Sequence, residues 1–292
     1  MKFILALNAI GIKTEELVPL ARGAEAAGFD GVMLGDHVVM PAAIQAEASY
    51  TKDGKSPMGF ETAWPECLSA MAYILGATTT LRVISSVLVL PMRNPLITAK
   101  SVQTMAVMSG GRVVLGVGSG WMAEEFAALG APFAGRGGRT DEAIQIIRTL
   151  GTAGAVEWHG EHFDIPRVSG HPTPPRPVPI YVGGEAEAAL RRAAFLGDGY
   201  LSVLRTRASL LKRLARLNEL REAAGRADQP FEFIGVPADA HTPEDFADLE
   251  AQGIGAAAVM AWQASYEKTD PPLAKKLDAI AAYGERVIGA LD

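Results

Sequence analysis

The chain has 292 residues, which is enough for one large barrel or for two average domains. Its 27 basic and 33 acidic residues give a net charge of −6, so it lacks the basic excess with which nucleic-acid binders neutralise phosphates. A single cysteine, Cys67, excludes an internal disulfide and a cysteine-based metal site, and no apolar run approaches the roughly 18 residues of a membrane span.

The first half of the chain alternates short apolar strands with helices. Residues 1–8 are apolar but too short for a secretory signal, so we expect a cytoplasmic protein with neither nucleic-acid nor membrane partners. The polar, aperiodic residues 41–62 predict a long functional loop. Strands are predicted over residues 3–7, 31–34, 81–90 and 113–117, and helices over 14–28, 64–79, 94–108 and 137–150.

The second half begins with a hairpin predicted over residues 156–165, followed by six prolines between 166 and 179 that predict an extended connector. Strands are then predicted over 178–182, 199–203, 231–236 and 256–260, and helices over 186–196, 208–224, 243–252 and 271–291. Eight buried strands alternate with helices, which predicts an α/β fold. We expect a (β/α)8 TIM barrel with inserted loops and a small hairpin, forming a single domain over residues 1–292, in preference to an open doubly wound sheet.

In such a barrel the chemistry lies on the loops that follow the strands. The stretch 116–120 reads GxGxG, which is neither the GxGxxG dinucleotide fingerprint nor a GxSxG nucleophile elbow. Gly183 and Gly184 open directly onto a helix and are the better phosphate candidates. His159 and His162 lack an accompanying carboxylate pattern, so we expect no metal site. The strand-end candidates are Asp36, His37, Ser85, Ser86, Gly118, Ser119, Gly120, Trp121, Gly183, Gly184, Glu185, Arg205 and Arg207.

Several short motifs keep a common order and spacing from about residue 3 to residue 203. They are AEAAGFD at 24–30 with Asp36-His37, LPMRNPL at 90–96, SGGR at 109–112 running into LGVGSGW at 115–121, EEF at 124–126, HGEHF at 159–163 and PIYVGG at 179–184. With these motifs the chain resembles the bacterial luciferase-like superfamily of flavin and deazaflavin oxidoreductases. The resemblance is closest to the subgroup that depends on coenzyme F420.

The resemblance implies a role for most of the candidate residues. Asp36 would lie near the pyrimidine edge of the cofactor and His37 near the transferred hydride, so we expect both to be catalytic residues. Trp121 stands where some relatives carry a proton-donating glutamate, and Met40 where some carry an aromatic residue, so we assign both to the substrate pocket. The cofactor face would be lined by a cis Ser86–Val87 peptide and by the backbone of Gly118, Ser119 and Gly120. The phosphate would be held by the backbone amides of Gly183 and Gly184, and the adjoining Glu185 is also assigned to the cofactor site.

The resemblance further implies a homodimeric oxidoreductase that transfers a hydride between F420 and a small organic substrate. The alternatives are an FMN-dependent luciferase-like monooxygenase and a non-catalytic flavin-binding relative. Residues 191–216 contain seven basic residues against Asp198 alone, and Arg205 and Arg207 fall on the cofactor face. Because F420 carries an anionic tail beyond its phosphate, this cationic segment favours F420 over FMN. For Lys212 to Arg216 a solvated helix face is the simpler interpretation.

Overall fold

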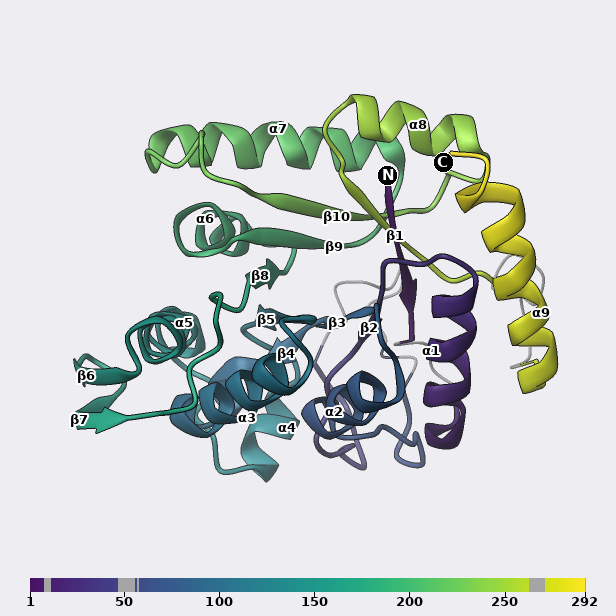
Figure 1. Ribbon diagram of the computed structural model, residues 1–292. Helices are drawn as coiled ribbons and strands as arrows, with labels where there is room; N and C mark the ends of the chain where they lie inside the picture. The colour runs from purple at the N-terminus through teal and green to yellow at the C-terminus, as the bar shows by residue number, and fades with distance from the viewer. Residues whose placement is uncertain (8–11, 47–55, 57, 263–270, 292) are drawn as a thin grey trace.

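The main sheet of the protein is a closed parallel barrel. The computed structural model describes residues 1–7, 12–46, 56, 58–262 and 271–291 (Figure 1). Strand β3 pairs with β2 and also with β5, where Val83 lies opposite Val113, and this second pairing closes the sheet. The predicted barrel is therefore confirmed over an open sheet. Its strands are β1 (Lys2–Ala6), β2 (Gly31–Leu34), β3 (Arg82–Ser85), β5 (Val113–Gly118), β8 (Ile180–Gly183), β9 (Gly199–Arg205), β10 (Glu232–Pro237) and β11 (Ala256–Val259).

Helices surround the barrel and begin at capping residues that the sequence supplies (Figure 1). Asn94 accepts the backbone N–H groups of Leu96 and Ile97, and Thr242 forms a capping box with Asp245. No helix among the described residues combines the length and apolar character that crossing a bilayer requires. The helices are α1 (Leu17–Ala26), α2 (Cys67–Ala77), α3 (Pro95–Met108), α4 (Ala123–Ala128), α5 (Arg136–Ala153), α6 (Glu187–Leu196), α7 (Arg207–Ala223), α8 (Pro243–Ala251) and α9 (Leu273–Tyr283), with a π-helical turn at Gly284–Ile288.

The barrel buries apolar side chains on both faces of its strands. A large cluster lies between the strands and the helices, and a smaller one fills the barrel interior. Because the interior is packed, a ligand must bind at the end of the barrel, on the loops after the strands. The interior cluster consists of Ile4, Ala6, Met33, Ile84, Val114, Tyr181, Leu201, Ile234, Ala256 and Ala258.

The third predicted strand, 81–90, is interrupted, which corrects the prediction of one continuous element. Strand β3 ends at Ser85, the Ser86–Val87 peptide is cis as the resemblance implies, and a two-residue strand β4 (Leu88–Val89) follows. Up to Ser86 the segment is bonded to β2, because the Ser86 N–H donates to the Leu34 carbonyl. Beyond it, β4 pairs only with β5.

The predicted hairpin forms outside the barrel, beside α5 (Figure 1). Strands β6 (Ala155–His159) and β7 (Asp164–Ser169) pair antiparallel, so the prediction that residues 166–169 belong to the connector is wrong. Pro166 is tolerated because the pairing register shifts between Val156 and Trp158, where a ladder N–H is not needed. Within the described residues, no group of three or more His, Cys, Asp or Glu side chains is placed to hold a metal ion.

Candidate active site

The candidate residues gather at one end of the barrel because all eight strands run in the same direction. Asp36 and His37 lie in the loop after β2. The 118–121 turn begins at the last residue of β5, the 183–185 turn begins at the last residue of β8, and Arg205 is the last residue of β9. Parallel strands place these loops at the carboxyl end of the barrel, where TIM-barrel enzymes build their active sites.

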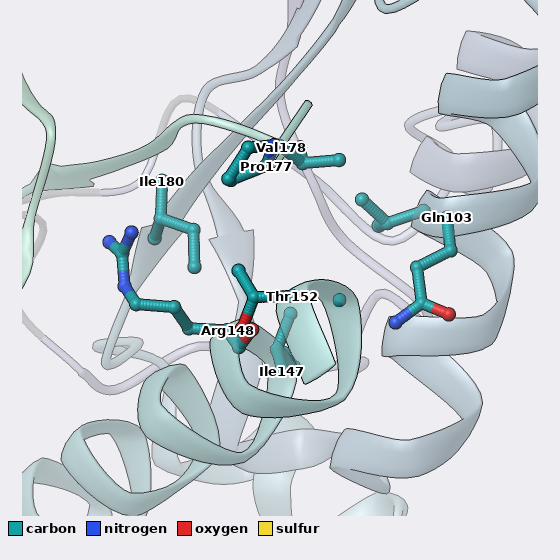
Figure 2. A pocket seen from close by; sticks show the side chains of 9 residues that line it. Gln103, Ile147, Arg148, Thr152, Pro177, Val178 and Ile180 are labelled. Atoms are coloured by element: carbon teal, nitrogen blue, oxygen red, sulfur yellow. Dashed lines mark hydrogen bonds between the residues drawn. The ribbon is translucent and has the colours of Figure 1, made fainter. Parts of the chain in front are cut away.

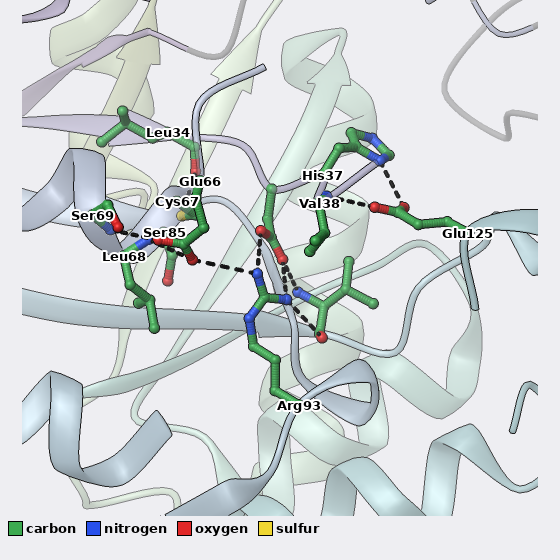
Figure 3. A network of polar contacts seen from close by, with 12 residues as sticks. Leu34, His37, Val38, Glu66, Cys67, Leu68, Ser69, Ser85, Arg93 and Glu125 are labelled. Atoms are coloured by element: carbon green, nitrogen blue, oxygen red, sulfur yellow. Dashed lines mark hydrogen bonds and ion pairs between the residues drawn. The ribbon is translucent and has the colours of Figure 1, made fainter. Parts of the chain in front are cut away.

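Asp36 is held in a bidentate ion pair with Arg93 (Figure 3). Arg93 donates to Oδ1 and Oδ2 at 2.8 Å each, and the Val89 N–H donates to Oδ2 at 2.8 Å. Burial raises the pKa of Asp36, and Arg93 with the Val89 N–H opposes that effect. Both carboxylate oxygens are engaged and the side chain has no exposed surface. Asp36 therefore fixes the loop after β4 and does not present a free carboxylate.

His37 forms a buried dyad with Glu125 from α4 (Figure 3). His37 Nδ1 lies 2.9 Å from Glu125 Oε2, and both residues are buried. The rings of Trp64 and Trp121 meet the imidazole edge to face, with centroid distances of 5.2 and 6.4 Å. Among the described residues, the hydrogen bond of the imidazole is the one at Nδ1.

The charge state of Glu125 sets the tautomer of its partner. Burial raises the pKa of Glu125, but the hydrogen bonds from His37, Val38 and Val39 outweigh burial and lower that pKa below its ordinary value. The carboxylate is thus ionised at neutral pH and can only accept. Nδ1 of the imidazole must therefore carry the hydrogen that lies between the two groups.

Val87 sits between the two glycine turns, and this position explains two of the glycines. A Cβ at Gly118 would come 2.5 Å from Val87 Cγ2, and a Cβ at Gly183 would come 2.6 Å from Val87 Cγ1. Gly118 and Gly183 are therefore required by packing against Val87, whether or not a ligand approaches their backbone. The Ser86–Val87 peptide thus packs directly against Gly118 and Gly183 at the carboxyl end of the barrel.

The turn after β5 is fixed by α5. Thr140 lies 3.1 Å from the Ser119 hydroxyl, and Arg136 donates to the Gly120 carbonyl at 3.2 Å. Arg136 also stacks over the Phe133 ring at 3.8 Å. The turn thus has a defined conformation before any ligand contacts it, which suits a surface that positions a planar ring.

The turn after β8 has the properties of an anion site. Gly184 has φ +133°, a conformation that side-chain-bearing residues rarely adopt. Helix α6 begins just beyond, with Ala186 at the N-cap and no side chain capping it within the described chain. The first N–H groups of the helix lack intrahelical acceptors and lie at the positive end of the helix dipole.

Glu185, Arg205 and Arg213 form an ion cluster beside this turn. The Glu185 carboxylate pairs with Arg205, and Arg213 donates to its Oε2 at 3.0 Å and to its backbone carbonyl at 3.1 Å. Glu185 Oε1 is buried with no hydrogen-bond partner among the described residues. Tyr200 completes the cluster by donating to the Gly184 carbonyl at 2.8 Å.

Acidic partners neutralise much of the basic segment 191–216. The charge of this segment is therefore weak support for F420 over FMN. Arg207 donates to Asp245 at 2.7 Å and faces the loop after β10. Arg191 stacks on the Phe195 ring at 5.4 Å. Five of the seven basic residues in 191–216 form ion pairs: Arg192 with Asp141, Arg205 and Arg213 with Glu185, Arg207 with Asp245, and Arg216 with Glu187 and Glu219.

The loop after β2 is tied to α4 as well. Glu124 accepts the N–H groups of Gln45 and Ala46 at 2.7 and 3.2 Å. Met40 lies within this anchored segment and is partly exposed. Within the predicted 41–62 loop, residues 47–55 and 57 lie outside the described residues.

A sequence model of the luciferase-like monooxygenase family matches residues 3–284. The chain belongs to this luciferase-like family. An uncharacterised protein of Mycobacterium tuberculosis is 36% identical over 273 residues, covering 93% of this chain and 94% of that protein. An F420-dependent glucose-6-phosphate dehydrogenase of Gordonia bronchialis is 30% identical over 224 residues, covering 75% of this chain and 61% of that enzyme.

The fold agrees with solved members of the luciferase-like group. The structure of an F420-dependent secondary alcohol dehydrogenase, in complex with an F420-acetone adduct, superposes with a TM-score of 0.76. It is 18% identical and the match covers 100% of this chain and 99% of that enzyme. Likeness at this identity establishes the shared barrel.

Four residues of this luciferase-like site escaped the sequence reasoning. Glu125, Arg93, Trp64 and Arg213 contact the predicted residues from elements distant in sequence. Glu125 and Arg93 do lie within the EEF and LPMRNPL motifs. These motifs indicated the family but did not indicate that the two residues contact His37 and Asp36. Nothing in the sequence singled out Trp64. Interpreting Lys212 to Arg216 as a solvated helix face is wrong for Arg213, because Arg213 pairs with Glu185.

A small cavity of about 20 Å³ lies away from this site (Figure 2). It opens between α3, α5 and the first residue of β8, Ile180, which places it at the amino end of the strands. Arg148, Gln103 and Thr152 line it. The volume suffices for roughly one water molecule, so it cannot hold an organic ligand.

Proposed function

We propose that the protein is an F420-dependent oxidoreductase that transfers a hydride between the deazaflavin and a small organic substrate. The observation that carries this proposal is the buried His37–Glu125 dyad beside the packed surface of Val87, Gly118 and Gly183. A dyad of this kind is suited to moving one proton at a fixed position. The F420-dependent relative from Gordonia bronchialis supports the choice of cofactor.

The residues at the barrel mouth suit the parts of such a cofactor. The ring would lie on the Ser86–Val87 peptide and the 118–120 turn, and the phosphate would accept N–H groups from Gly184 and the start of α6. The Glu185 carboxylate partly neutralises the positive charge of Arg205 and Arg213 beside this phosphate position. Met40 and Trp121 would line the substrate side, and Asp36 would act by fixing the loop after β4.

The bound deazaflavin supplies the hydride chemistry, and the protein supplies position and a proton. When a hydride leaves a carbon that bears a hydroxyl group, the hydroxyl proton must leave as well. His37 Nε2 accepts that proton in the oxidising direction and returns it to the substrate oxygen in the reducing direction. Trp64 and Trp121 border the imidazole and limit water around it.

FMN is the second candidate cofactor, and one observation about the charged residues supports it. The phosphate turn after β8 serves either cofactor, and the acidic partners of the basic segment leave little free cationic surface for the longer F420 tail. In that case the protein would be a monooxygenase, in line with the family's description. A catalytically inactive flavin-binding protein is the remaining alternative.

Direct titration with F420 and with FMN tests the proposal. We expect F420 to bind at least about tenfold more tightly, a difference of about 1.4 kcal/mol. Arg205→Ala should weaken binding of the phosphate-bearing cofactor, because Arg205 belongs to the cluster beside the phosphate turn. Arg207→Ala is the matched control, since Arg207 is directed toward Asp245, and it should leave the affinity unchanged.

The result that overturns the proposal is tighter binding of FMN. Turnover then separates an enzyme from an inactive relative: reduction of F420 by a panel of small alcohols, or its reoxidation by the matching carbonyl compounds, is followed by absorbance. Absence of any turnover with a tightly bound cofactor would favour the flavin-binding alternative.

A further inference from the structure

The two carboxylate oxygens of Glu125 have different tasks (Figure 3). Oε1 accepts the backbone N–H of Val38 at 2.6 Å and that of Val39 at 3.4 Å. Oε2 lies 2.9 Å from His37 Nδ1. The side chain is only 2% exposed, so solvent does not replace these contacts. One oxygen thus holds the loop backbone and the other holds the imidazole.

This division of tasks dictates how a glutamine would sit at position 125. Backbone N–H groups can only donate, so the atom at the Oε1 position must be an acceptor. The carbonyl oxygen of the glutamine would take that place, and its NH2 group would face His37 Nδ1. Because the amide donates, Nδ1 would have to accept, and the neutral imidazole would carry its hydrogen on Nε2 instead.

The other groups around His37 offer no substitute for the carboxylate. The indoles of Trp64 and Trp121 meet the ring edge to face and carry only a donor N–H. Asp36, the neighbouring acid, is directed to Arg93 by a bidentate pair. Among the described residues, Glu125 is the acidic group in contact with the imidazole.

We propose that Glu125 is a positioning residue that fixes the hydrogen of His37 on Nδ1 and so keeps a lone pair on Nε2, toward the substrate. This inference rests on the proposed function for its catalytic consequence, but the tautomer itself does not depend on any cofactor. With the tautomer fixed, neutral His37 accepts a proton at Nε2, and the resulting cation is stabilised by the ionised Glu125.

The test uses Glu125→Gln with selective 15N labelling of histidine, and His37→Ala to assign the His37 resonances. In the unaltered protein we expect the imidazole shifts of an Nδ1–H ring, and in Glu125→Gln those of an Nε2–H ring. The matched control is Glu124→Gln, which removes a neighbouring charge that, among the described residues, accepts the N–H groups of Gln45 and Ala46. It should leave the His37 resonances unchanged.

Kinetics give the second measurement. Glu125→Gln should lower kcat by about 100-fold or more while the cofactor Kd changes by less than about threefold, because the loop contact at Oε1 is kept. Glu125→Asp retains the charge and should recover part of the loss.

Two outcomes overturn the inference. One is an Nδ1–H tautomer that persists in Glu125→Gln, and the other is a parallel fall of kcat and cofactor affinity, which would make Glu125 an anchor for the loop alone. If the unaltered protein turns over no substrate, the proposed function fails, while the NMR result still decides the tautomer.

Discussion

Acidic side chains anchor several loops of this protein by accepting backbone N–H groups. Glu25 accepts from Thr79, Thr80 and Leu81, and Glu142 accepts from the hairpin turn at 161–163. Glu124 and Glu125 do the same for the loop after β2. Glu25 and Glu125 lie in motifs that carry the family resemblance, so part of that resemblance reflects loop anchoring rather than catalysis.

A different acidic residue, Glu232, ties strands together at the amino end of the barrel. Its carboxylate contacts Lys2 at 2.7 Å, Arg82 at 2.8 Å and the Tyr181 hydroxyl at 2.7 Å, which joins β10 to β1, β3 and β8. Burial raises the pKa of Glu232, but these partners outweigh burial and lower the pKa from 4.5 to about 2. The folded state therefore favours the ionised form more than the unfolded state does.

The sign of the resulting pH dependence follows directly. Because the pKa of Glu232 is lower in the folded protein, its contribution is fully present above about pH 4.5 and is lost as the pH falls toward 2. We expect Glu232→Gln to lower the free energy of unfolding at pH 7 by about 2 kcal/mol and to flatten its decline in acid. Urea denaturation at a series of pH values measures both effects.

Glu222→Gln is the control for this experiment. Glu222 is an exposed residue of α7 without an ion-pair partner among the described residues. Glu222→Gln should leave the acid dependence of the free energy of unfolding as it is in the unaltered protein. Equal acid dependence in both variants would show that the Glu232 cluster does not stabilise the barrel.

At the scale of elements, two helices complete the site at different strand ends. The short α4 supplies both anchors of the loop after β2, and α6 presents its amino end to the turn after β8. An uncapped helix start is a cost to stability that an anion can offset. Gly184 cannot be used to test this, because its φ of +133° and the closeness of Ala189 make any side chain there a fold perturbation.

Ala186, at the exposed N-cap of α6, gives a cleaner test. Ala186→Asn and Ala186→Asp should each raise the free energy of unfolding by about 1 kcal/mol by capping the helix. Both caps compete with a phosphate for N–H groups, and the aspartate also repels it. Binding of F420 should therefore weaken by about threefold for the asparagine and by about tenfold or more for the aspartate.

The comparison ligand is the deazaflavin chromophore that lacks the phosphate, whose affinity should not respond to either substitution. Calorimetric titration supplies the affinities and thermal unfolding the stabilities. Stabilised variants that bind F420 as tightly as the unaltered protein would exclude the start of α6 as the phosphate site.

At the scale of the whole molecule, we propose the homodimer that the family resemblance implies. Helices α2 and α3 pack against each other and expose large apolar side chains: Tyr73 is 74% exposed, Ile97 69% and Met108 84%. In a twofold dimer the same patch on each copy would cover these groups. Covering this face with a second copy would remove these apolar groups from water, which favours association.

The prediction is a dimer mass in light scattering coupled to gel filtration. The double variant Tyr73→Glu with Ile97→Glu should elute as a folded monomer, because buried unpaired carboxylates oppose association. Phe195→Glu, on α6 and 42% exposed, is the control that should remain a dimer. A monomeric unaltered protein at micromolar concentration would contradict the proposal.

The sequence by itself determined the order of elements and the barrel. Strand lengths, helix caps and glycine positions are local, so hydrophobic periodicity and capping residues located β1, β2, β5 and the later strands and helices with small errors at their ends. The sequence also placed His37 and the glycine turns at strand ends, and the cis Ser86–Val87 peptide that the family resemblance implied is present.

The tertiary structure decided which charges are free and which residues work together. Asp36 and Arg207 look available in the sequence, yet Arg93 and Asp245 engage them across 57 and 38 residues. Glu125 reaches His37 across 88 residues. Whether a charge is neutralised depends on distances set by packing between distant segments, and residue types with local spacing do not contain that information.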